Sequence, residues 1–259
     1  IAYNLALLGE APRVLATVGE DFGDYRQHLA ASGVDTSLIR EVAGEYTALA
    51  FITTDRADNQ ITGFYPGAMR RAGELSLADL VERPDLVIVA PNAPEAMARY
   101  PAECRARGVP YVFDPGQGLP MLSGEQLVAC IRGARCVIGN DYEMALIAEK
   151  TGYTPEALRE LAEVVIVTRG EHGSTIYDAT GRTDIPVAPP RQVVDPTGAG
   201  DAYRAGVLWG LLRGEPAARY GRVASLAATY AVEVYGTQEH RYTPAEFAAR
   251  FREAFGEAL

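Results

Sequence analysis

The sequence predicts an α/β fold with a mostly parallel central sheet, and three observations support this. Apolar runs alternate with helical patterns through the middle of the chain, so that strand follows helix repeatedly. The runs are apolar throughout, which is typical of parallel strands covered by helices on both faces. The chain has 259 residues, 48% of them hydrophobic, which is enough for one domain with a large core.

The expected elements follow in order along the chain. We expect a first strand at Val14–Val18 and a helix at Phe22–Ala31, which ends at Gly33 because glycine tolerates the left-handed conformation after a helix. Further strands are predicted at residues 86–90, 111–113, 137–138 and 164–167. Further helices are predicted at residues 94–107, 124–131, 141–149, 155–163, 199–213, 216–235 and 244–258.

Two pairs of β-rich segments predict hairpins. Thr47–Thr54 and Ile61–Tyr65 flank the polar stretch Asp55–Asn59, and together they interrupt the alternation of strands and helices. We therefore expect a small β lid at about residues 40–70, within a single domain that spans residues 1–259. Ser174–Asp178 and Thr183–Val187 predict the second hairpin.

Charge and composition exclude several classes of protein. The net charge of −10 argues against a nucleic-acid binder, which normally presents a basic face. No apolar run approaches the roughly 18 residues of a membrane span, and no signal peptide is visible. Cys104, Cys130 and Cys136 lack the spacing of a zinc site, so we interpret them as buried thiols of a cytoplasmic protein.

Lysine is almost absent from this chain. Of the 24 basic residues only Lys150 is a lysine, and no glycine-rich loop precedes it. A P-loop ends in Gly-Lys-Ser or Gly-Lys-Thr. Any phosphate site in this protein therefore works without that lysine.

Polar residues follow the predicted strands at the edge where a parallel sheet binds its ligands. Asp114 and Gln117 follow one strand, and Asn140 and Glu143 follow the next. Thr168 follows a third strand. Each has a structural alternative, because such residues also order loops, cap helices and begin ordinary hairpin turns.

The most informative stretch runs from Val193 to Gly206 and reads as a strand, a turn of small residues and a helix. Gly198, Ala199 and Gly200 let backbone N–H groups approach a ligand closely. The free N–H groups of a first helical turn, together with the helix dipole, form an anion site that needs no lysine. The following helix is apolar almost all round, so we expect it to be buried and to hold the turn rigidly.

Asp201 lies in the first turn of this predicted helix, where a carboxylate would repel a phosphate. It is useful there if it accepts the proton of an alcohol that attacks the phosphate. The alternative is that Asp201 only caps the helix in a glycine-rich turn. Spacing alone leaves both interpretations open.

These residues resemble a known family. Asp195-Pro196-Thr197-Gly198-Ala199-Gly200-Asp201, followed after three residues by Ala205-Gly206-Val207-Leu208, is similar to the C-terminal signature of the ribokinase-like (PfkB) carbohydrate and nucleoside kinases. A second family signature has the spacing of Ala2, Gly9 and Gly19 and would place an Asn directly before Ile1. The resemblance covers essentially the whole chain. It implies a three-layer α/β/α sandwich with a small β lid.

The resemblance also implies the chemistry and its cofactors. It implies transfer of the γ-phosphate of ATP, with Mg²⁺, to a hydroxyl group. Asp201 matches the catalytic base, and the backbone of Gly198, Ala199 and Gly200 matches the anion hole. Because the chain starts without Met inside an apparently helical segment, we expect the early acceptor-binding residues of the family to lie before Ile1.

Nucleotide and metal sites are expected by the same resemblance. Asn140 and Glu143 match a motif that positions Mg²⁺ and phosphate. The remaining residues expected to bind the nucleotide are Thr168, Gly170, Gly173, Ala228 and Gly236. Asp195 and Thr197 fall where some relatives bind a monovalent cation such as K⁺.

The acceptor is predicted from stretches that look like bacterial and archaeal adenosine or nucleoside kinases, at residues 50–69, 113–118 and 140–143. We expect adenosine to be phosphorylated at its 5′-hydroxyl. Phe64 would stack on the base or pack in a small core, and Asp114 and Gln117 would lie near the ribose.

Other functions are weighed against this one. A sugar kinase of the same family is the alternative, because its catalytic machinery is the same. A non-catalytic nucleotide sensor would have no use for Asp201, and a Rossmann dehydrogenase would need a Gly-x-Gly-x-x-Gly that is absent after the first strand. Lid strands with open edges could pair between subunits, so we expect a homodimer.

Overall fold

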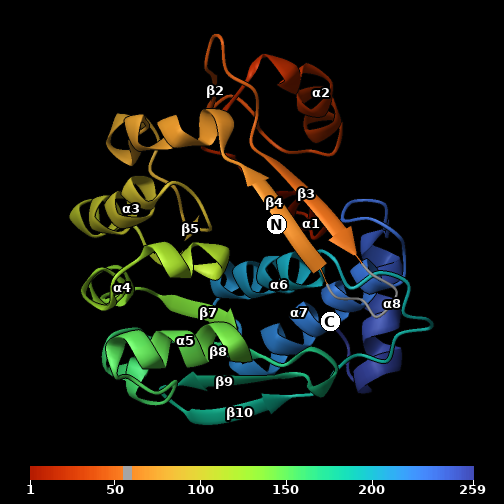
Figure 1. Cartoon of the computed structure of the whole chain (residues 1–259). Coiled ribbons are helices and arrows are strands. Elements are labelled where there is room, and N and C mark those ends of the chain that lie inside the picture. The colour runs from red at the N-terminus through yellow and green to blue at the C-terminus, as the bar shows by residue number, and fades with distance from the viewer. Residues whose placement is uncertain (55–59) are drawn as a thin grey trace.

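A computed structural model describes residues 1–54 and 60–259, and its main element is a six-stranded sheet (Figure 1). The strand order is β10-β9-β8-β7-β6-β5. The strands are β5 (Val87–Val89), β6 (Tyr111–Phe113), β7 (Cys136–Asn140), β8 (Val165–Thr168), β9 (Ser174–Asp178) and β10 (Gly181–Ile185). β5 to β8 run parallel, whereas β9 and β10 are antiparallel to their neighbours. The predicted, mostly parallel sheet is confirmed.

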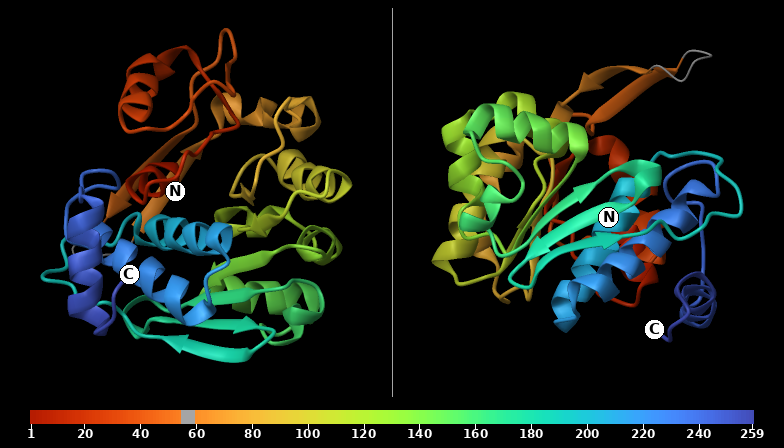
Figure 2. Two further views of the ribbon diagram at one scale, coloured as in Figure 1. Left: turned by 180° about the vertical axis from the view of Figure 1, so that it is seen from behind. Right: turned by 90° about the horizontal axis from the view of Figure 1, so that it is seen from below.

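Helices cover both faces of the sheet, as the view from below in Figure 2 shows. One face carries α3 (Pro94–Ala106), α4 (Gly124–Ile131) and α5 (Asp141–Thr151), and the other carries α6 (Ala199–Arg213) and α7 (Ala217–Val232). α8 (Pro244–Phe255) packs on α7, and α1 (Ala2–Leu7) packs on α6. The three-layer α/β/α arrangement is confirmed.

The parallel strands β5 to β8 are short, but each contributes side chains to two hydrophobic cores. Tyr111 and Phe113 of β6 pack beneath α3 to α5, whereas Val112 between them packs against α6 and α7. Successive side chains of a strand point to opposite faces of its sheet. Each of these three side chains is at most 1% exposed, so the carboxyl end of β6, where Asp114 follows, is held firmly.

The helix predicted at residues 155–163 is wrong. Only one 3₁₀ turn forms there, at Ala157–Glu160. The backbone groups that would continue a helix bond elsewhere: Gly133 N donates to Leu161 O at 2.8 Å, and Glu163 N donates to Ala134 O at 3.0 Å. Two helical hydrogen bonds remain, from Leu158 N to Thr154 O and from Ala162 N to Leu158 O, but bonds to a distant segment prevent the helix from continuing.

A second small sheet was missed by the sequence prediction. β2 (Ile39–Glu41) pairs in parallel with β1 (Ala16–Val18), next to α2 (Gly23–Ala31). The sequence around β2 is polar, and two of the three residues are exposed. Pairing with β1 makes this segment a strand, and a pattern search for apolar runs does not find it.

The expected hairpin is present as a separate two-stranded sheet, which we call the lid: β3 (Leu49–Thr54) and β4 (Gln60–Tyr65). The strands pair antiparallel, with Leu49 opposite Tyr65. The stretch Asp55–Asn59, which was predicted to connect them, lies outside the described residues. The second predicted hairpin is also confirmed, as β9 and β10.

The cysteines are buried, as predicted. Burial raises the pKa of the Cys104 thiol to about 12 and that of Cys130 to about 11, so both are protonated at neutral pH. Across residues 1–54 and 60–259, no helix combines the length and apolar character needed to cross a membrane.

Candidate active site

The start of α6 has the geometry of an anion site. Gly198 precedes the helix with a φ of +87°, a left-handed conformation that side chains other than glycine rarely adopt. Ala199 N donates a long hydrogen bond of 3.2 Å to Pro196 O. Within the described part of the chain, the N–H groups of Gly200 and Asp201 have no backbone or side-chain acceptor. They are therefore available to an anion.

Asp201 lies at this helix start with an exposed side chain. The next residue, Ala202, is fully buried, and it donates the first regular helical hydrogen bond to Gly198 O at 3.0 Å. The buried part of α6 thus fixes a turn whose carboxylate and free N–H groups face solvent. This arrangement suits a base that acts on a hydroxyl beside a phosphate.

A buried ion pair joins α6 to the neighbouring strand ends. Arg204 Nη2 donates to Asp114 Oδ1 at 2.7 Å, and Arg204 Nε donates to the other oxygen of the same carboxylate. The Arg204 side chain is 11% exposed and that of Asp114 is 4% exposed. Burial raises the pKa of the Asp114 carboxyl, and the charge of Arg204 opposes that shift.

This geometry bears on the predicted role of Asp114. Its two oxygens are occupied by a guanidinium, which fits the alternative that Asp114 orders the site; its contact with a ribose stays a prediction. Sequence reasoning missed Arg204. The available signal was a single charged residue between Asp201 and Arg213 in an otherwise apolar helix, one turn after the proposed base.

Asn140 and Glu143 form a capping box at the start of α5. Glu143 N donates to Asn140 Oδ1 at 2.7 Å, and Asn140 N donates to Glu143 Oε2 at 2.8 Å. Asn140 and Glu143 therefore do cap α5, as the structural alternative predicted, and their role toward Mg²⁺ and phosphate stays a prediction. The same Glu143 oxygen lies 3.7 Å from Arg204 Nη2, so the box also adjoins the ion pair. Asn140 is the register partner of Thr168 on β8, which brings two predicted nucleotide positions side by side.

Asp195 ties two loops together. Its Oδ1 accepts from Thr197 N at 2.9 Å, and its Oδ2 accepts from Gly236 N at 3.0 Å. Hydrogen bonds from Thr197 and Gly236 lower the pKa of the Asp195 carboxyl. A Cβ on Gly198 would lie 3.1 Å from Thr237, so the loop at residues 236–237 lies against the start of α6.

The predicted cation site at Asp195 and Thr197 gains no support from this geometry. Both Asp195 oxygens are already committed to backbone N–H groups. The residues that the structure describes also contain no cluster of three His, Cys, Asp or Glu side chains that could hold a metal.

The remaining predicted residues lie at varying distances from this centre. Gly170 and Gly173 belong to the tight connection from β8 to β9, in which Arg169 N donates to Gly173 O at 2.8 Å. Ala228 is partly buried in α7 against the core. Gln117 is exposed in the turn after β6. Phe64 lies on the lid and is 55% exposed.

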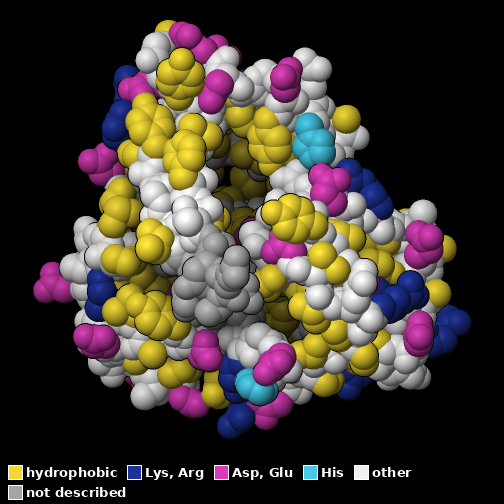
Figure 3. Space-filling model, turned by 45° about the vertical axis from the view of Figure 1, so that its right-hand side comes forward, with side chains coloured by type: hydrophobic (Ala, Val, Ile, Leu, Met, Phe, Trp, Pro, Cys, Tyr) yellow, Lys and Arg dark blue, Asp and Glu magenta, His cyan; other side chains and the backbone are white. Residues whose placement is uncertain are grey.

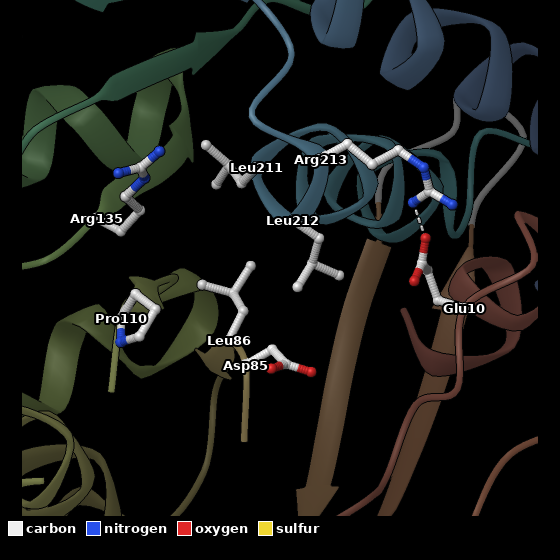
Figure 4. Close-up of a pocket in the computed structure, with 8 residues that line it drawn as sticks. All are labelled: Glu10, Asp85, Leu86, Pro110, Arg135, Leu211, Leu212 and Arg213. Atoms are coloured by element: carbon white, nitrogen blue, oxygen red, sulfur yellow. Dashed lines mark hydrogen bonds and ion pairs between the residues drawn. The ribbon is translucent and has the colours of Figure 1, made fainter. Parts of the chain in front are cut away.

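A cavity of about 610 Å³ lies at the opposite edge of the sheet (Figure 4). Leu86, Pro110 and Arg135, which line it, directly precede β5, β6 and β7. Arg213, at the far end of α6, also lines it and pairs with Glu10. α6 is roughly 22 Å long, so this cavity is separated from Asp201 by the length of the helix. Ligands of such sheets bind at the carboxyl edge instead.

The fold and the site together define a phosphotransferase. Comparison with known proteins agrees with this class. Residues 1–244 match the pfkB family of carbohydrate kinases. A nucleoside kinase of Methanothermobacter thermautotrophicus is 38% identical over 98% of this chain and 84% of its own length.

Solved structures of nucleoside kinases are also similar to this chain. Burkholderia thailandensis nucleoside kinase in complex with inosine superposes with a TM-score of 0.96 at 39% identity, covering 100% of this chain and 85% of the other. The same enzyme in its ADP-inosine complex has a TM-score of 0.95 at 39% identity, and the match covers 99% of this chain and 81% of the other. The chain belongs to the pfkB family of carbohydrate kinases, and its fold is the ribokinase fold predicted from the signatures.

Proposed function

We propose that this protein is an ATP-dependent nucleoside kinase that phosphorylates the 5′-hydroxyl of a purine nucleoside, with adenosine as the first candidate. The carrying observation is the start of α6, where an exposed carboxylate lies beside unpaired backbone N–H groups. The relatives described above are named nucleoside kinases, and one was solved with inosine. These support a nucleoside acceptor over a simple sugar.

The reaction follows from the placement of these groups. Asp201 accepts the proton of the acceptor hydroxyl as its oxygen bonds to the γ-phosphorus, while the bond from that phosphorus to the ADP oxygen breaks. The N–H groups of Gly200 and Asp201 stabilise charge on the transferred group. Of the residues predicted to form the anion hole, Gly200 offers an unpaired N–H group, whereas the N–H of Ala199 is bonded to Pro196 O.

Mg²⁺ fits this site through Glu143. One of its oxygens accepts the Asn140 N–H, and the carboxylate keeps further acceptor capacity. Mg²⁺ in such enzymes needs only one or two carboxylates, since phosphate oxygens and water complete its shell. When bound, it would neutralise charge on the phosphates of ATP. A K⁺ site near Asp195 and Thr197 is supported by the family resemblance alone.

The lid supports recognition of the base. Phe64 exposes 55% of its surface on a hairpin that stands apart from the main sheet, as Figure 1 shows. Stacking of a base on an aromatic side chain contributes about 1–3 kcal/mol. Closure of the lid over the acceptor would also exclude water, which otherwise competes for the phosphoryl group.

A comparison of acceptors tests this proposal. We expect kcat/KM for adenosine and inosine to exceed that for ribose or fructose by at least about 100-fold, because a base adds stacking energy of about 3 kcal/mol. Phe64→Ala should lower kcat/KM for nucleosides about tenfold or more and leave that for ribose unchanged. Coupled assays of ADP release measure kcat/KM of the wild-type protein and of the variant for each acceptor. ATP hydrolysis in the absence of acceptor is the control. Faster phosphorylation of ribose or fructose would establish the sugar-kinase alternative.

We also propose that the lid pairs two copies of the chain into a homodimer. On one face of the lid, Phe51 is 64% exposed and Ile61 is 78% exposed. Ile52, on the other face, is 51% exposed. A lone two-stranded sheet is marginally stable in water, so an apolar cover on one face would stabilise it. Figure 3 shows hydrophobic side chains gathered along both sides of a deep hollow on one side of the molecule.

The dimer is tested by Phe51→Asp. An aspartate buried in an apolar interface costs several kcal/mol, so we expect the dissociation constant to rise at least about 100-fold. Val81→Asp is the control, because Val81 is fully exposed outside the lid. Sedimentation equilibrium measures both. A monomeric wild-type protein, or equal dissociation constants for the two variants, would rule out a dimer through the lid.

A further inference from the structure

Arg204 holds an unusual position, because a largely buried cation lies one helical turn from an exposed carboxylate. Burying a guanidinium is unfavourable unless it is paired and hydrogen-bonded. Asp114 supplies that pairing to Nη2 and Nε, from a side chain that is itself only 4% exposed. The guanidinium is therefore fixed in position, and its orientation is set by a carboxylate that follows a different element, β6.

The third nitrogen of the Arg204 guanidinium, Nη1, does not take part in this ion pair. Within the part of the chain that the structure describes, Nη1 makes no hydrogen bond. It is also not one of the fully buried side-chain atoms that lack a partner. Nη1 therefore reaches solvent, although most of the side chain does not. A guanidinium that is fixed by an ion pair and keeps an accessible, unpaired Nη1 amino group can donate hydrogen bonds to a ligand.

Nη1 points toward the start of α6. A Cβ placed on Gly200 would lie 2.8 Å from Nη1. Helical side chains lean toward the N-terminus of their helix, so Arg204, four residues on, reaches back over Gly200. Gly200 and Asp201 each carry an unpaired backbone N–H group. A positively charged side-chain donor therefore lies against Gly200, a residue with a free backbone donor, next to the proposed base Asp201.

We propose that Arg204 is a catalytic residue whose Nη1 donates a hydrogen bond to the phosphoryl group during transfer, and that Asp114 is the positioning residue that aims it. This inference rests on the proposed kinase function. Arg204 supplies the side-chain cation that a chain with a single lysine lacks at its phosphate site. Glu143, 3.7 Å from Nη2, lies beside the same guanidinium, on the side of the α5 capping box.

The decisive comparison separates catalysis from folding. Arg204→Gln alone leaves Asp114 buried without a partner, so this variant should lose thermal stability. The double variant Arg204→Gln with Asp114→Asn replaces the ion pair by two neutral amides that can bond to each other. We expect the double variant to recover most of the lost Tm, while kcat stays about 100-fold below that of the wild type. KM for ATP and for the nucleoside should change less than about threefold.

A second readout does not depend on turnover. Aluminium fluoride bound with Mg²⁺ and ADP imitates the transferred phosphoryl group, so its affinity should fall about 100-fold in the double variant, whereas the affinity for Mg²⁺ and ADP alone should not change. Arg213→Gln, which removes an arginine from the other end of α6, is the matched control and should keep wild-type kinetics.

Two results would overturn the inference, and they are distinguishable. If the wild-type protein phosphorylates nucleosides and the double variant regains both Tm and kcat, or binds the fluoride complex as the wild type does, Arg204 is structural only and the proposed function stands. If the wild-type protein phosphorylates no hydroxyl acceptor, the proposed function fails and the inference fails with it.

Discussion

Asp201→Asn should lower kcat about 1,000-fold or more, with little change in the affinity for ATP. Asparagine keeps the size and the capping ability of aspartate, but it cannot accept the proton of the attacking hydroxyl. General-base catalysis by a positioned side chain contributes about 10²–10⁴-fold. Loss of a negative charge beside the phosphates should, if anything, strengthen ATP binding. Steady-state kinetics and calorimetric titration with ATP measure the two quantities.

The control for this variant is Asp24→Asn. Asp24 is also a carboxylate in a first helical turn, that of α2. Both substitutions remove a favourable interaction with a helix dipole, which contributes at most about 1 kcal/mol at an exposed site. Asp24→Asn should therefore leave kcat unchanged. Unchanged turnover in Asp201→Asn would show that Asp201 is not the base, and a wild-type protein that binds ATP without turnover would establish the sensor.

Gly206→Ala should destabilise the protein by about 3 kcal/mol, although alanine favours helices. Gly206 lies where α6 crosses α7, and a Cβ there would lie 2.3 Å from Ala224 Cα and 2.6 Å from Ala224 N. Backbone atoms of a packed helix cannot give way as the end of a flexible side chain can. Overpacking costs about 1–3 kcal/mol or more, whereas the gain in helix propensity is about 1 kcal/mol. The clash therefore outweighs the propensity.

The effect of Gly206→Ala should extend to activity, because α6 also carries Asp201 and Arg204. Gly23→Ala is the control: nothing lies within 4 Å of a Cβ at Gly23, and its φ of −54° suits alanine. Denaturant unfolding should show a lower midpoint for Gly206→Ala and an unchanged or higher one for Gly23→Ala. Equal midpoints would show that α6 and α7 separate at little cost.

Much of the fold was predictable because it follows from local patterns. The strand at Tyr111–Phe113 and the helices at Gly124–Ile131 and Ala199–Arg213 form at the predicted residues. An apolar run, a Ser or Thr before a helix and a glycine after it each act within a few residues. The same locality made the turn from Asp195 to Asp201 identifiable, since its proposed function depends on backbone groups of consecutive residues.

Segments whose structure depends on distant partners were predicted less well. Residues 155–163 have helical composition, but hydrogen bonds to Gly133 and Ala134 leave them one 3₁₀ turn. β2 is a strand only because β1 lies beside it. In both cases the free energy of a tertiary contact exceeds a local preference of a few tenths of a kcal/mol per residue.

By itself, the sequence determined the class of fold, the turn proposed to be catalytic and the need to hold phosphate without a P-loop lysine. Only the tertiary structure decided that Arg204 lies beside that turn, since its partner Asp114 is 90 residues away in the chain. A sequence pattern does not show which buried charges will meet. That choice is made when the sheet and α6 pack together, because a guanidinium removed from water must find its carboxylate.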